Sequence, residues 1–133
     1  MASRAARLKQ LLTLQEQVRA FHEMRHATHL AAAESAERDA TDILARKAEE
    51  GSLVDLFPDI YARAVQNAYA RRDAEREAAL KEAGYVAREK LRAGAVEKSW
   101  REALRAELRT AEEKAGLEAV ERLLSNRREQ ERS

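Results

Sequence analysis

The chain has 133 residues, of which 37% are charged and only 5% aromatic, and its 25 basic side chains nearly balance its 24 acidic ones. This composition disfavours a globular core and favours a coiled coil, whose narrow seam is mostly aliphatic. The near-neutral balance produces no global field that would attract nucleic acid or acidic lipid.

The cysteine and apolar content of the chain excludes further classes of protein. The absence of cysteine excludes a disulfide scaffold and a thiolate metal site. No apolar run approaches the roughly 18 residues of a membrane span, and no apolar block follows the basic residues near the start, as a secretory signal would require. We therefore expect a cytoplasmic protein without membrane insertion, peripheral to a membrane at most through its partners.

The first predicted element is a helix over residues 3–49, a stretch free of proline and glycine. Its apolar stripe consists of Leu8, Leu11, Leu12, Leu14, Val18 and Phe21. The last two of these and two of the leucines, Leu11 and Leu14, step by three, four and three, which is heptad-like. After Phe21 the apolar positions are mostly alanine, which predicts a thin, closely packed middle.

Residues 50–58 are predicted to form a short helical elbow at the tip of a hairpin. Gly51 suits a helix C-terminal cap, and Ser52 with Asp55 resembles a capping pair. Pro58 is tolerated only in the first turn of a helix, so the next helix must begin near it.

The second predicted helix covers residues 59–128 and is much longer than the first. Its apolar spacing mixes threes with fours, which predicts an irregular, shallow supercoil. A fold about residue 54 or 55 would place Trp100 beside Leu8 and Leu12. The predicted fold class is thus all-α: one antiparallel two-helix coiled-coil hairpin over residues 1–133, with a longer second helix.

The second helix continues beyond the reach of the first. From about Leu108 onward it has no partner in the chain, although its apolar stripe continues for roughly 20 residues. We therefore predict a protein-binding surface at this end, to which the opening residues of the first helix also contribute. The predicted contact residues are Leu117, Val120, Leu123, Leu124, Leu8 and Leu11.

One motif points to metal chemistry. His22-Glu23-Met24-Arg25-His26 matches H-E-x-x-H, the helical pattern in which two histidines bind zinc and the glutamate acts as a base. His29 adds a third imidazole on the same face, but the chain offers no strand or cleft. His22, His26 and His29 are therefore a weak metal candidate, and the favoured interpretation is a solvated or partly seam-facing polar stripe.

The sequence contains no motif for other kinds of catalysis or for nucleic-acid binding. There is no glycine-rich phosphate loop and no nucleophile context around any serine. The basic residues near the two ends, Arg4, Arg7, Arg127 and Arg128 among them, lack the aromatic side chains that stack on bases. We predict that the chain is not an enzyme, needs no cofactor and binds no nucleic acid.

Two segments carry a resemblance to a known family. They are LKQLLTLQEQV at residues 8–18 and VEKSWREALRAELRTAEEKAGLEAVE at residues 96–121. In these segments, in length and in hairpin layout, the chain resembles the flagellar export protein FliJ and its type III secretion relatives. The elbow at residues 51–58 has no counterpart in that pattern.

The resemblance implies a non-enzymatic stalk or chaperone-like adaptor in flagellar or type III protein export. Its implied partners are a hexameric export ATPase ring, the export gate and export chaperones. The sequence leaves two alternatives open: a structural coiled coil that associates with itself, and a metal-binding helix built on His22, His26 and His29.

Overall fold

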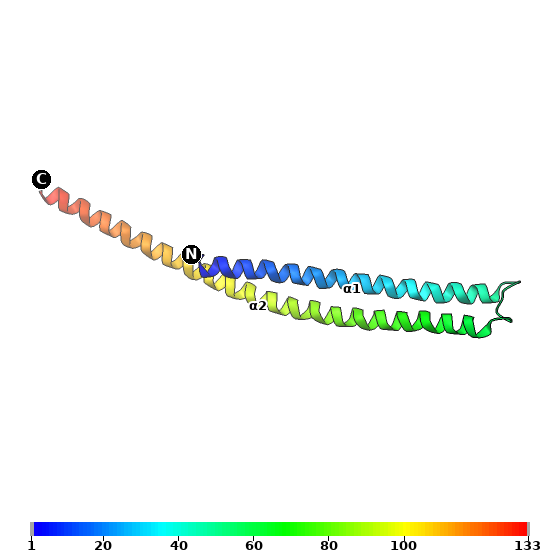
Figure 1. Ribbon diagram of the computed structural model, residues 1–133. Coiled ribbons are helices and arrows are strands. Elements are labelled where there is room, and N and C mark those ends of the chain that lie inside the picture. Colours follow the sequence, from blue (N-terminus) through cyan, green and yellow to red (C-terminus); the bar gives the residue numbers. More distant parts are fainter. Residues whose placement is uncertain (1, 133) are drawn as a thin grey trace. The chain divides into compact units, whose positions relative to one another are not determined.

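The computed structural model describes residues 2–132 and is all-α. Helix α1 spans Arg4–Ala48 and helix α2 spans Pro58–Arg132. The two helices pack antiparallel as a hairpin, and the second helix is the longer one (Figure 1). The predicted fold class is thereby confirmed, and the two-helix hairpin is consistent with a coiled coil.

The chain divides into two compact units, each containing part of both helices. The first unit comprises residues up to Gln15 together with residues from Arg92 onward, and the second unit comprises Glu16–Leu91. The second unit contains the connection between the helices, whereas the first contains the end of α2.

The connection between α1 and α2 is a series of turns. Gly51 has a φ of 76°, the left-handed conformation that glycine adopts most readily after a helix end. The Ser52 hydroxyl donates to the Lys47 carbonyl over 3.2 Å, so it caps the end of α1 and does not open a new turn. One helical hydrogen bond follows, from Phe57 N to Leu53 O at 2.9 Å. The predicted helical elbow is therefore reduced to a single turn ahead of Pro58.

The seam of the second unit follows a regular heptad pattern. Buried and half-buried positions recur at alternating intervals of three and four residues in both helices. The positions that keep this spacing in α1 are His22, His26, His29, Ala33, Ala36, Ala40 and Ile43; those in α2 are Tyr61, Val65, Ala68, Arg72, Glu75, Ala79, Glu82, Val86 and Glu89. Alanine side chains allow the two helices to approach closely.

The first unit continues the same pattern with Ala5, Leu8, Leu12 and Gln15 in α1. The matching α2 positions are Ala93, Val96, Trp100, Ala103 and Glu107. The Ala5 amide donates to Glu107 Oε1 over 3.2 Å, and Lys9 Nζ lies 4.5 Å from the centroid of the Trp100 ring. Trp100 thus lies beside residue 9, between its predicted neighbours Leu8 and Leu12.

The apolar stripe predicted for α1 is buried only in part. Leu8, Leu12 and Val18 are buried or half-buried, whereas Leu11, Leu14 and Phe21 are exposed. Toward the turn, the seam continues through His22. A three-four step describes several faces of a helix equally well, and the prediction selected the face with the largest apolar residues. The structure instead buries small and charged residues.

Candidate interaction surface

The end of α2 extends beyond α1 within the first unit. Here α1 begins at Arg4, and its first turn already lies against Glu107 of α2. Residues 109–132, called the overhang below, continue past that point as an unbroken helix (Figure 1). Within the overhang every described residue is exposed except Ala119, which is half-buried.

The predicted contact residues differ in their exposure. Leu117, Val120, Leu123 and Leu124 all lie in the overhang with at least half of each side chain exposed. Leu11 is also exposed, on a flank of α1, whereas Leu8 is half-buried in the seam. Leu8 is therefore placed to hold the hairpin together, and the overhang contains four of the six predicted residues.

Exposed leucines are not confined to the overhang. Further examples elsewhere on the chain are Leu14, Leu30, Leu44, Leu53, Leu56, Leu80, Leu91, Leu104 and Leu108. Buried apolar residues, in contrast, are all alanine except Leu12 among the residues that the structure describes. Many exposed large apolar side chains are typical of surfaces that bind other proteins.

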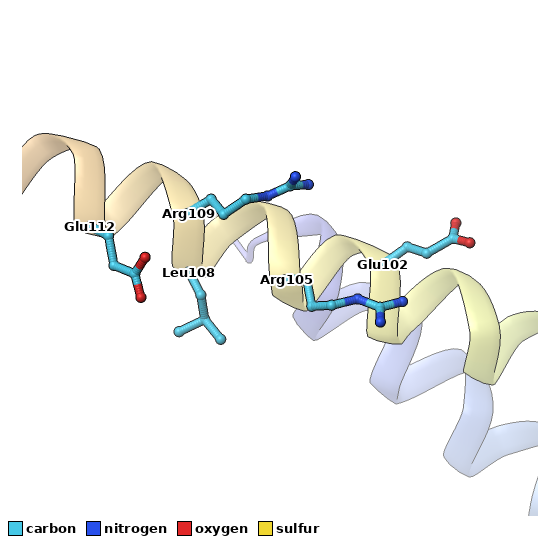
Figure 2. Close-up of a pocket in the computed structure, with 5 residues that line it drawn as sticks. All are labelled: Glu102, Arg105, Leu108, Arg109 and Glu112. Atoms are coloured by element: carbon cyan, nitrogen blue, oxygen red, sulfur yellow. The ribbon is translucent and has the colours of Figure 1, made fainter.

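A shallow hollow lies at the root of the overhang. Figure 2 shows Leu108 and Glu112 pointing to one side of α2 and Arg109 to the other. Glu102 and Arg105 complete its lining, so all of its side chains come from one helix. A single convex helix does not enclose a ligand, and this hollow is part of an open protein surface.

The H-E-x-x-H face lies inside the seam of the second unit and contacts acidic residues of α2. His22 Nδ1 donates to Glu82 Oε2 over 2.6 Å, and Arg25 Nε donates to Glu82 Oε1 over 2.9 Å. The Glu82 side chain is only 7% exposed. Burial opposes its ionisation, but the hydrogen bonds from His22 and Arg25 outweigh that effect and lower the pKa of Glu82 below its ordinary value.

His29 repeats the arrangement one level closer to the turn. Its Nδ1 donates to Glu75 Oε2 over 2.5 Å, whereas His26 lies half-buried between the two pairs. Across residues 2–132, no three His, Cys, Asp or Glu side chains are grouped so as to hold a metal ion. The predicted weak metal candidate of His22, His26 and His29 is thus arranged as a polar seam, with two imidazoles bound to carboxylates.

A further set of cross-helix pairs follows toward the turn. Glu37 accepts hydrogen bonds from Arg72 over 3.5 Å and from Arg76 over 3.1 Å, and Asp39 accepts one from Arg71 over 3.4 Å. These acidic and basic partners were not predicted, because the charged residues of both helices were assigned to solvent. Arg72 keeps the three-four spacing of Ala68 and Ala79, which was the available signal.

Neither helix of the described chain has an apolar stretch long enough to cross a membrane. Comparisons with protein-family models, with curated proteins and with solved structures gave no match.

Proposed function

We propose that this chain is a protein-binding coiled-coil component of a flagellar or related type III export apparatus. In this role it acts without chemistry of its own, as a cytoplasmic stalk or chaperone-like adaptor. Its partners would be the export ATPase ring, the export gate and export chaperones.

The observation that carries the proposal is the overhang. Leu117 and Leu123 are 68% and 70% exposed on a continuous helix over which α1 does not extend. An exposed row of leucines on a helix costs solubility unless another surface covers it, and a groove in a partner protein accepts such a helix readily.

The composition of the seam also supports the proposal. The hairpin is closed by alanines and by pairs such as His22 with Glu82 and Glu37 with Arg76. Because large apolar side chains are scarcely used there, they remain available on the outer faces of both helices. A hairpin that closes with small residues and exposes large ones suits an adaptor.

The family resemblance adds the identity of the partners. Its two segments, residues 8–18 and 96–121, supply most of the seam of the first unit and the root of the overhang. The segment at residues 96–121 therefore contains two of the exposed apolar residues of the overhang, Leu117 and Val120.

A binding experiment with a truncation tests the proposal. The export ATPase, the export gate and the export chaperones of the same organism would each be immobilised and exposed to the full chain. We expect at least one to bind it, and we expect that binding to be lost in a variant lacking residues 111–133. Circular dichroism must show that the truncated hairpin remains helical.

The control is Leu80→Asp, which changes an exposed leucine of the second unit that lies far along the chain from the overhang. It should bind like the unaltered chain. The proposal is wrong if none of these export components binds the full chain, or if the truncation binds equally well.

A further inference from the structure

We infer that the overhang is also a self-complementary surface, on which the overhang of a second copy of this chain docks antiparallel. This inference goes beyond the proposed role in export and does not depend on it. It rests on the order of apolar and charged residues along one exposed face of residues 109–132.

The apolar centre of this face is formed by Leu117, Val120 and Leu124. At 3.6 residues per turn these three side chains point within about 60° of one another. All three are at least half exposed. In an antiparallel pair centred on Val120, Leu117 of one copy lies within one residue of the level of Leu124 of the second copy, and the two Val120 side chains meet at the two-fold axis.

Counted outward from this centre, the charges on its two sides come in opposite order. On one side Glu113 is followed by Arg109, and on the other side Arg127 is followed by Glu131, all four exposed. The same helical geometry places them within about 80° of the apolar residues. Antiparallel pairing therefore brings Arg109 against Glu131 of the second copy, and Glu113 against Arg127 of the second copy.

Each of these contacts occurs twice in a symmetric pair, so four opposite-charge contacts flank the apolar centre. A parallel pair in register would instead place every one of these residues against its own copy and create four like-charge contacts. The charge order thus selects both the occupant and its direction. Within one chain, Arg127 Nε and Glu131 Oε1 already lie 3.7 Å apart, which holds both heads on this face.

Arg109 belongs both to this face and to the lining of the neighbouring hollow. Figure 2 shows Arg109 pointing away from Leu108 and Glu112, so the self-complementary face begins on the opposite side of α2 from those two side chains. An antiparallel second helix would run in the same direction as α1, along the part of α2 that α1 does not cover.

The first test is sedimentation velocity on the full chain from about 5 to 500 μM. Because only three apolar residues per chain enter the interface, we expect a reversible dimer with a dissociation constant on the order of 10 μM or weaker. The double variant L117D/L124D should remain monomeric over this range, and Leu80→Asp should behave like the unaltered chain. A monomer at every concentration would overturn the inference.

A charge exchange tests the direction. Glu113→Arg and Arg127→Glu each replace two attractive contacts by two repulsive ones, so each should weaken the dimer by about tenfold or more. The double variant E113R/R127E restores complementarity and should dimerise like the unaltered chain. A mixture of the two single variants should form a heterodimer. If the double variant dimerises no better than the single ones, the antiparallel pairing is wrong.

Cysteine crosslinking adds an independent readout, because the chain has no cysteine of its own. Val120→Cys should form a disulfide-linked dimer on mild oxidation. Glu113→Cys should crosslink with Arg127→Cys in a mixture and should not crosslink with itself. Efficient crosslinking of Glu113→Cys with itself would indicate parallel pairing and would overturn the inference. Circular dichroism on each variant separates loss of pairing from loss of helix.

Discussion

The seam of the second unit and the overhang use their residues in opposite ways. In the seam, Ala40 and Ala68 are completely buried and Glu82 is nearly so, while in the overhang Leu117, Leu123 and Leu124 are exposed. The two regions belong to equally regular helices. What differs is whether a second helix of the same chain lies alongside.

This contrast shows how little the size of an apolar residue says about its position in this molecule. Alanine gains little from burial, roughly 0.8 kcal/mol for one methyl group, but it permits close packing of two helices. The hairpin then gains specificity from paired charges such as Glu82 with His22 and Arg25. Leucines outside the seam contribute to contacts with other molecules.

The largest expected effect comes from truncating one leucine in a seam and one in the overhang, which tests whether only the seam leucine stabilises the hairpin. Leu12 is 5% exposed in the seam of the first unit, and Leu12→Ala should lower the free energy of unfolding by about 2–3 kcal/mol. Leu123→Ala, at 70% exposure in the overhang, should change it by less than about 0.5 kcal/mol. Urea unfolding followed by circular dichroism measures both. Equal effects would mean that the overhang is covered in solution.

Enlarging an alanine tests the close packing of the seam. Ala40 is 0% exposed, so Ala40→Leu must push the helices apart and should destabilise the hairpin by about 1–3 kcal/mol. The same change at Ala111, exposed in the overhang, should be close to neutral. Thermal unfolding of the two variants gives the answer. A neutral Ala40→Leu would contradict the tight alanine seam.

The Glu82 pair sharpens the comparison through pH. Because the folded chain lowers the pKa of Glu82, the carboxylate stabilises the hairpin fully above the ordinary pKa of a glutamate, about 4.3. That contribution disappears as the pH falls through the lower, folded-state pKa. At pH 7 the melting temperature of Glu82→Gln should therefore be lower than that of the unaltered chain. The decrease should be smaller than the one caused by Ala40→Leu.

The difference in melting temperature between Glu82→Gln and the unaltered chain should shrink as the pH is lowered below about 4. Glu118→Gln, in the exposed overhang, is the matched control and should show little difference at any pH. A gap that stays constant from pH 7 to pH 3 would show that Glu82 does not contribute as a carboxylate.

The smallest expected effects come from glycines inside α2. Gly84 lies in the second unit and Gly116 in the overhang, and a β-carbon added to either would meet no atom within 4 Å. Alanine at Gly84 should stabilise the hairpin by about 0.5–1 kcal/mol. At Gly116 it should raise the helical signal of the overhang without shifting the hairpin transition. Reversed results would mean that the overhang unfolds together with the hairpin.

Helix type and hairpin topology could be predicted because they depend on local chemistry. A long stretch without proline, the break at Gly51 and the limit at Pro58 specify where helices can exist. The neighbourhood of Trp100 followed from the position of that break alone. The composition of the seam could not be predicted in the same way, since Leu11 and Leu14 form as regular a pattern as the residues that are buried.

The candidate surface was predicted in part for the same reason. Leu117 to Leu124 follow from arithmetic, because a longer helix must leave its end without an intramolecular partner. Leu8 lies half-buried in the seam, and its contact with a partner stays a prediction. The choice between adjacent faces of α1 depends on small energy differences summed over many layers. The charge order from Arg109 to Glu131 is visible in the sequence, but it gains meaning only when the same face is seen to be exposed.

The sequence by itself thus determined that this protein is two helices of unequal length joined by a short connection. Proline, glycine and helix-forming residues affect the backbone conformation of only a few neighbouring residues, so the helix limits can be predicted without knowledge of long-range contacts. Only the tertiary structure decided which face of each helix is the seam. That choice depends on whether alanine meets alanine and Glu82 meets His22 across the helix interface, and the same choice leaves the leucines outside.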